Sequence, residues 1–116
     1  MNKRAKGKEK ELLACSYLKD KGYLILVENY YCHYGEVDLI AKEKNDLVFI
    51  EIKYRNSAVC GDAIEAVDLR KQKKIAKCAL NYLRENQIVE YNLRFDVIGI
   101  QDNKISHYQD AFCFFM

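Results

Sequence analysis

The sequence predicts an α/β fold in which helices flank a mixed β-sheet, in the order helix, three strands, helix, strand. Two segments repeat apolar residues with a period of about 3.6, and the runs between and after them are rich in valine, isoleucine and aromatic residues. The second helical segment separates the third strand from the fourth, so it is a crossover that lets these strands lie parallel. We expect residues 1–116 to form a single domain, because this length supports one hydrophobic core.

The first half of the chain predicts a helix followed by an antiparallel meander. The helix is expected over about 3–21, where apolar residues repeat at helical spacing until Gly22, a residue that tolerates a left-handed cap. Three strands are expected at 23–28, 36–42 and 47–54, with an irregular aromatic stretch over 29–35 and a polar turn over 43–46. A loop follows over 56–61, and the segment 63–67 is ambiguous.

The second half predicts a basic helix and two further strands. Asp68 is the expected N-cap of a helix that reaches about Glu85, because apolar residues then repeat on one face. A strand is expected over 94–101, and a turn leads from it into a short fifth strand. The tail over 111–116 is too apolar to remain in water, so it packs on the sheet or contributes to a homodimer contact.

The overall charge is weak, but the basic residues are unevenly distributed. A net charge of +2 gives no argument for nucleic acid by itself. Ten of the 19 lysines and arginines fall in two short stretches: Lys3, Arg4, Lys6, Lys8 and Lys10, and Arg70, Lys71, Lys73, Lys74 and Lys77. These patches either bind phosphates or are solvated helix faces, and the sequence leaves both interpretations open.

The five cysteines form an odd set without C-x-x-C spacing, which indicates a reduced, intracellular protein. Cys15 and Cys78 fall on apolar helical stripes, where a free cysteine behaves as a small hydrophobe. Cys32 and His33 lack the second ligand pair that a zinc site requires. No signal peptide and no apolar run long enough to cross a bilayer are present, so we expect a cytoplasmic protein.

Three acids and a lysine stand within two otherwise apolar strands, in the runs GEVDLIA and VFIEIKYR. Side chains alternate along a strand, so Glu36 and Asp38 share a face, as do Glu51 and Lys53. Carboxylates at the edge of an apolar sheet repel one another and resist desolvation, and a bound cation offsets both effects. A charge pair on a solvated face explains one such pair better than two on neighbouring strands. The pattern therefore predicts a metal site.

An acid in the second strand and an acid-x-lysine in the third resemble the PD-(D/E)xK nuclease superfamily and its restriction-endonuclease-like core (α-β-β-β-α-β). The chain more closely resembles the YraN-like (UPF0102) family of small predicted endonucleases. That resemblance extends over nearly the whole length and includes Glu11, Asn29, the basic helix and the run RFDVIGI. Archaeal Holliday junction resolvases are more distantly similar. The resemblance implies a Mg²⁺- or Mn²⁺-dependent endonuclease that hydrolyses phosphodiester bonds of DNA, including branched or structured DNA.

The resemblance also implies roles for the acids and the lysine. Asp38 and Glu51 would bind the metal, with the carbonyl of Ile52 as a further ligand, since a hard cation prefers oxygen. Lys53 would orient the attacking water or stabilise charge that develops on the phosphate. Glu36 would support these ligands or bind a second metal ion.

Glu11 joins this catalytic set for two reasons. It lies on the inward apolar stripe of the first helix, where an acid needs a partner, and the resembling families place an acid of this helix in the active site. The expected nucleic-acid-binding residues are Arg55, Lys71, Lys73 and Lys74. A structural ion pair explains Arg55 equally well, while Lys71 or Gln72 matches the place of an auxiliary residue in related nucleases.

Two further groups admit two interpretations each. Asp96 either points toward the same site or pairs with Arg94 or Arg55, and we favour the structural role. Three tyrosines just before the acidic motif can stack on bases, although core packing is the better interpretation for at least one of them: Tyr30, Tyr31 and Tyr34.

The chain departs from the family pattern at a few positions before the acidic motif. Tyr31 and His33 stand where the family usually has arginines, and Lys10 stands where it usually has a glycine. The first two changes put phosphate contacts there in doubt but leave the metal ligands intact. A non-catalytic nucleic-acid-binding protein and a structural or partner-binding module remain alternatives. The full acidic set favours the nuclease, because a mere binder has no need of repelling carboxylates.

Overall fold

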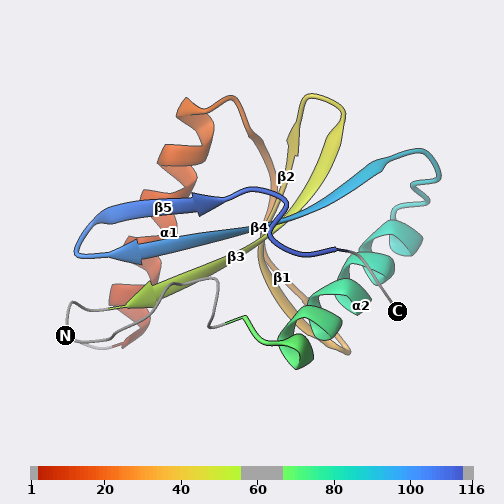
Figure 1. Cartoon of the computed structure of the whole chain (residues 1–116). Helices are drawn as coiled ribbons and strands as arrows, with labels where there is room; N and C mark the ends of the chain where they lie inside the picture. The colour runs from red at the N-terminus through yellow and green to blue at the C-terminus, as the bar shows by residue number, and fades with distance from the viewer. Residues whose placement is uncertain (1–2, 56–66, 114–116) are drawn as a thin grey trace.

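The computed structural model describes residues 3–55 and 67–113. The loop expected over 56–61, most of the ambiguous segment 63–67 and the last three residues of the tail lie outside this range. The elements are α1 (Lys3–Asp20), β1 (Leu24–Cys32), β2 (Gly35–Glu43), β3 (Asp46–Arg55), α2 (Leu69–Glu85), β4 (Asn92–Gln101) and β5 (Lys104–Tyr108). Figure 1 shows the twisted sheet between the two helices.

The five strands form one mixed sheet in the order β1-β2-β3-β4-β5. The pairs β1–β2, β2–β3 and β4–β5 are antiparallel, whereas β3 and β4 are parallel. α2 connects the two parallel strands, as the sequence predicts for a crossover (Figure 1). The predicted α/β class and element order are therefore confirmed, and they are consistent with a restriction-endonuclease-like core.

Each helix covers one face of the sheet. Leu18 of α1 packs in a cluster with Ile50 of β3 and Ile98 of β4. Cys78 of α2 belongs to a second cluster with Phe49, the β3 residue adjacent to Ile50. Because neighbouring residues of a strand face opposite sides, the two clusters identify an α1 face and an α2 face. Neither helix has the length and apolar composition of a membrane span within the described residues.

The helix ends follow the predicted signals. Gly22 adopts a left-handed φ of 93° after α1, which favours glycine. Asp68 is the N-cap of α2, and its side chain accepts a hydrogen bond of 2.9 Å from the backbone N–H of Lys71. At the other end of the chain, Phe112 stacks on Phe95 with ring centroids 4.9 Å apart. The prediction that the tail packs on the sheet is thus confirmed as far as Phe112.

β1 is longer than predicted. Residues 29–32 continue the strand instead of forming an irregular stretch, and Cys32 pairs with Gly35 at the end of the ladder. The physical reason is local: Asn29 takes a left-handed φ of 56°, which asparagine tolerates, and strand pairing resumes after it. The aromatic segment therefore forms the tip of a β1–β2 hairpin.

Candidate functional site

The sheet opens at the predicted acids. Pairing between β2 and β3 runs from Glu43 and Asp46 up to Leu39 and Ile50. Beyond this point β2 continues along β1, while β3 continues along β4. Asp38 and Glu51 are the next residues on the two strands, so they lie where the strands diverge.

Asp38 and Glu51 differ in how their oxygens are satisfied. Oδ2 of Asp38 accepts a hydrogen bond of 2.7 Å from the backbone N–H of Ile52. Glu51 is only 5% exposed, and its Oε2 has no hydrogen-bond partner among the described residues. The nearest cation is Lys71, whose Nζ lies 3.6 Å from that oxygen. A buried carboxylate oxygen without a hydrogen bond is uncommon in folded proteins, and it makes Glu51 a candidate for a functional role.

The protonation of Glu51 reflects this position. Burial raises the pKa of Glu51 to about 8, and the nearby negative charge of Asp38 contributes to the rise. Lys71 and Lys53 oppose it, because a positive neighbour favours the carboxylate. The structure thus places Lys53 and Lys71 within electrostatic reach of Glu51.

Glu11 reaches the same cluster from α1. Its Oε1 accepts a hydrogen bond of 2.8 Å from Nδ2 of Asn29, the residue with left-handed backbone in β1. Burial raises the pKa of Glu11 against the effect of this hydrogen bond, and the charges of Glu28 and Asp38 raise it further. The inward orientation predicted for Glu11 is therefore observed, and we call Glu11, Asp38 and Glu51 the acidic cluster.

The sequence patterns gave no role to Asn29, which entered only through the family resemblance. An asparagine between two strand-forming runs is the signal that could have drawn attention to it, because asparagine commonly adopts left-handed backbone. In the structure, this conformation accompanies the side-chain contact with Glu11.

Glu36 lies at the rim of the cluster. It faces Tyr31 across the β1–β2 ladder, and its charge is the main cause that raises the pKa of Tyr31, followed by burial. Glu11 and Asp38 also raise the pKa of Tyr31, so this exposed tyrosine lies near Glu36 and two members of the acidic cluster. Tyr30 instead packs edge-on against Tyr82 in the core, as expected for at least one tyrosine of this run.

A basic hollow adjoins the acidic cluster. It has a volume of about 240 Å³ and is lined by Lys53, Asp68, Arg70, Lys71 and Lys74. Lys71 connects the two regions through its contact with Glu51. Of the other residues predicted near the substrate, Lys73 is exposed on α2 and does not line the hollow. Gln72 donates a hydrogen bond of 3.0 Å to the backbone carbonyl of Val67. The side chain of Arg55 lies outside the described part of the chain.

Asp96 belongs to a separate network on the α1 face. Its oxygens accept hydrogen bonds of 2.9 and 3.0 Å from Arg94, and His107 Nε2 lies 2.7 Å away. Burial would raise the pKa of Asp96, but the contacts with His107, Arg94 and the N–H of Asp110 lower it to about 2. The pairing with Arg94 that we favoured from the sequence is present, and it accounts for this buried acid.

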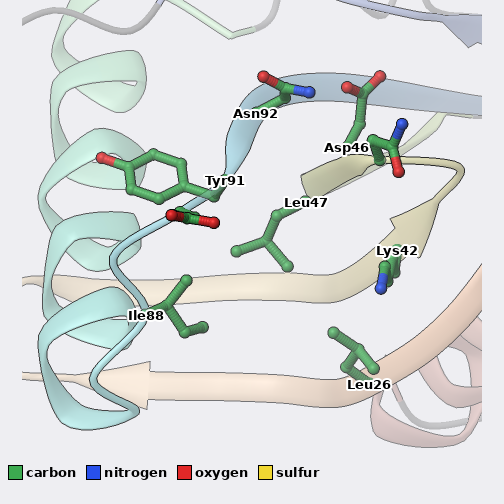
Figure 2. A pocket seen from close by; sticks show the side chains of 9 residues that line it. Leu26, Lys42, Asp46, Leu47, Ile88, Tyr91 and Asn92 are labelled. Atoms are coloured by element: carbon green, nitrogen blue, oxygen red, sulfur yellow. The ribbon is translucent and has the colours of Figure 1, made fainter.

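A larger hollow of about 460 Å³ lies near the β2–β3 turn, at the opposite end of these strands from Asp38 and Glu51. Figure 2 shows the side chains around it, among them Leu26, Leu47, Ile88 and Tyr91. None of the residues predicted to be functional lines this hollow.

The acidic cluster is compatible with a hard cation, although it does not form a complete ligand set. Within the described part of the chain, no three histidine, cysteine or acidic side chains are grouped closely enough to hold a metal by themselves. Asp38 and Glu51 offer two carboxylates, and Mg²⁺ commonly binds through one or two carboxylates while it keeps several waters. The unpartnered Oε2 of Glu51 supports this fit, because a cation would satisfy it.

Fold and site together define an α/β protein with a restriction-endonuclease-like element order and an acidic cluster where its sheet opens. A family model described as "Uncharacterised protein family UPF0102" matches residues 10–100. A UPF0102 protein of Caldanaerobacter subterraneus subsp. tengcongensis is 42% identical, with 97% of this chain and 98% of that protein aligned. One from Thermodesulfovibrio yellowstonii is 47% identical over 91% and 94%. The chain belongs to the UPF0102 family.

Proposed function

We propose that this protein is a metal-dependent endonuclease that hydrolyses DNA phosphodiester bonds, with Mg²⁺ or Mn²⁺ held by Asp38 and Glu51. The observation that carries the proposal is Glu51, a buried carboxylate with an unpartnered oxygen next to a second carboxylate. A bound divalent cation would neutralise this pair and supply Lewis-acid stabilisation of charge on the phosphate.

The chain's own residues support the remaining requirements of phosphodiester hydrolysis. Lys53 lies at the junction of the acidic cluster and the basic hollow, where an ammonium group can orient a water molecule or stabilise a phosphate oxygen. Arg70, Lys71 and Lys74 line the same hollow and offer positive charge to a DNA backbone. Asn29 fixes the Glu11 carboxylate through its hydrogen bond, and we assign Glu11 to the rim of the metal site.

DNA is the proposed partner and the cytoplasm the proposed location. Branched or structured DNA is the proposed substrate form, and Tyr31 is available to contact a base because its side chain is 71% exposed beside the acids.

The decisive experiment is a cleavage assay on end-labelled single-stranded, duplex, flapped and four-way-junction DNA, with Mg²⁺, with Mn²⁺ and with a chelator. We expect metal-dependent cleavage that is lost in Asp38→Asn and in Lys53→Ala. The matched controls are Asp20→Asn and Lys42→Ala, which change exposed residues away from the cluster and should cleave like wild type.

Cleavage that persists in Asp38→Asn would exclude the proposed site. If no substrate is cut but DNA binding is retained and depends on Lys71 and Lys74, the protein is a binding module of the same fold. Loss of both binding and cleavage would favour a structural or partner-binding role.

A further inference from the structure

Two cysteines that are distant in the chain meet where the β1–β2 hairpin packs against α2. Sγ of Cys32 in β1 lies 3.1 Å from Sγ of Cys78 in α2. A disulfide bond is about 2.05 Å long, so the sulfur atoms need to approach by only about an ångström to form one. This proximity is not a consequence of neighbouring sequence, because 46 positions separate the two residues.

The two thiols have different environments. Cys32 is partly exposed, and its sulfur accepts a hydrogen bond of 3.4 Å from the backbone N–H of Tyr34. Cys78 is fully buried, and burial together with its contact to Cys32 raises the pKa of Cys78 to about 12. Cys32 is therefore the sulfur that a small oxidant reaches first, and Cys78 is held beside it as a protonated thiol.

The other described cysteines have different neighbours. Cys15 lies in the α1 cluster, and its sulfur is 3.9 Å from Oε1 of Glu28. Cys113 is exposed near the end of the described chain. Within residues 3–55 and 67–113, Cys32 and Cys78 are thus the pair placed for reaction with each other.

We propose that Cys32 and Cys78 form a site of reversible oxidation, at which a peroxide converts the two thiols into a disulfide that links β1 to α2. The thiolate of Cys32 attacks a peroxide oxygen, which gives a sulfenic acid and hydroxide. The sulfur of Cys78 then attacks the Cys32 sulfur, the S–O bond breaks, and the departing hydroxide takes up the Cys78 proton and leaves as water. In total, two thiols and one hydrogen peroxide give one disulfide and two water molecules, and a thiol reductant reverses the change.

The disulfide would enclose the segment that carries most of the acidic cluster. Residues 33–77 lie between the two cysteines and include Asp38 and Glu51. A link across such a long segment restricts the unfolded chain, so the oxidised protein should melt at a higher temperature than the reduced protein. This inference goes beyond the proposed nuclease function and does not depend on it.

The test is oxidation of the full chain with hydrogen peroxide, followed by alkylation of free thiols and non-reducing peptide mapping by mass spectrometry. We expect a Cys32–Cys78 cross-link, a loss of two hydrogen atoms in the intact mass and a melting temperature that rises by several degrees and falls again with reductant. The variant Cys113→Ser, which changes an exposed cysteine, is the matched control and should behave like wild type. Cys32→Ser should abolish the cross-link.

Cys78→Ala removes the second sulfur, so a sulfenic acid should accumulate at Cys32 and react with dimedone. Because Cys78 is buried, this variant can lose stability. The peptide mapping of the oxidised wild-type protein tests the proposal without this variant. The proposal is overturned if both thiols are alkylated after oxidation, if Cys32 pairs with another cysteine, or if the cross-link lowers the melting temperature. None of these outcomes depends on whether the protein cleaves DNA.

Discussion

Asp96 and Glu51 are buried carboxylates on neighbouring strands, and the structure compensates their desolvation in opposite ways. In the parallel β3–β4 ladder, Ile50 pairs with Asp96 and Glu51 pairs with Val97, so the two acids are close in register but face opposite sides of the sheet. Asp96 is fully buried and Glu51 is 5% exposed. The desolvation of a carboxylate opposes folding in both cases.

The difference lies in their partners. Arg94, His107 and a backbone N–H surround Asp96, and its pKa is lowered to about 2. Glu51 has an unpartnered oxygen and a negative neighbour, and its pKa is raised to about 8. The first arrangement stabilises the folded chain by itself, whereas the second is completed only by a proton or a cation. This contrast separates a structural acid from a candidate functional one more clearly than burial does.

The largest expected effect is on stability, when each acid is replaced by its amide, which keeps the shape of the side chain. Asp96→Asn should lower the free energy of unfolding at pH 7 by about 3–5 kcal/mol, because Arg94, which is mostly buried, and His107 both lose the charge of a fully buried partner. Glu51→Gln should leave stability unchanged or increase it, because folding at pH 7 requires Glu51 to take up a proton and the neutral amide has no such cost. Urea unfolding of both variants beside wild type measures this, and equal losses in the two variants would contradict the comparison.

The next effect is on the pH dependence of stability. The unfolded Glu51 loses its proton near its usual pKa of 4.5, whereas the folded residue retains it until about pH 8. Unfolding therefore releases a proton in this range, and the free energy of unfolding should fall by up to a few kcal/mol as the pH rises from about 4.5 to 8. Glu51→Gln should flatten this slope. Unfolding titrations at several pH values measure it, and an unchanged slope in the variant would exclude Glu51 as its source.

Asp96 should produce the opposite slope in acid. Its pKa falls from the usual 3.8 to about 2 on folding, so the stability it contributes is complete above about pH 4 and is lost as the pH falls toward 2. The same titrations extended to low pH should show this loss in wild type and its absence in Asp96→Asn. The effects of Asp96 and Glu51 on stability thus fall in separate pH ranges and can be measured independently.

A metal ion should act on only one of the two acids. If Asp38 and Glu51 bind Mn²⁺ in the folded state alone, a concentration 100 times the dissociation constant should stabilise the protein by about 2.7 kcal/mol. The corresponding rise in melting temperature should disappear with a chelator and in Asp38→Asn. Asp20→Asn, which changes an exposed acid, should retain it. An equal shift in both variants would mean that the metal binds elsewhere.

The comparison also explains what could be predicted from the sequence. Alternation in the strands and the helical stripe are local patterns, so they predicted the element order and the inward orientation of Glu11, which the structure confirms through the hydrogen bond of Glu11 with Asn29. Arg94, two positions from Asp96, could be predicted as its partner, but the other partners of Asp96 are not local. His107 lies 11 positions away and Tyr23 lies 73 positions away, so no periodicity indicates that they meet.

The limits of the site prediction have a similar origin. Side-chain alternation indicated which acids share a face. The opening of the sheet after Leu39 and Ile50, however, depends on the pairing of β2 with β1 and of β3 with β4, which alternation does not predict. The conformation of Asn29 was missed because a polar residue before an aromatic run favours a loop in the sequence, whereas the pairing of Glu28 and Tyr30 with β2 keeps it within a strand.

The smallest expected effect concerns Lys71, which contacts the site from α2. Its Nζ lies 3.6 Å from Glu51 and its side chain is 35% exposed, so the pair should contribute no more than about 1 kcal/mol to stability. Lys71→Met should nevertheless raise the pKa of Glu51 further, because it removes a positive charge that opposes the rise. The downward slope of stability with pH should then extend to higher pH, while Lys73→Met, on the same helix but exposed, should leave it unchanged. A Lys71 variant with the wild-type slope would show that solvent screens this contact, and the burial of Glu51 together with Asp38 would then be sufficient to explain its protonation.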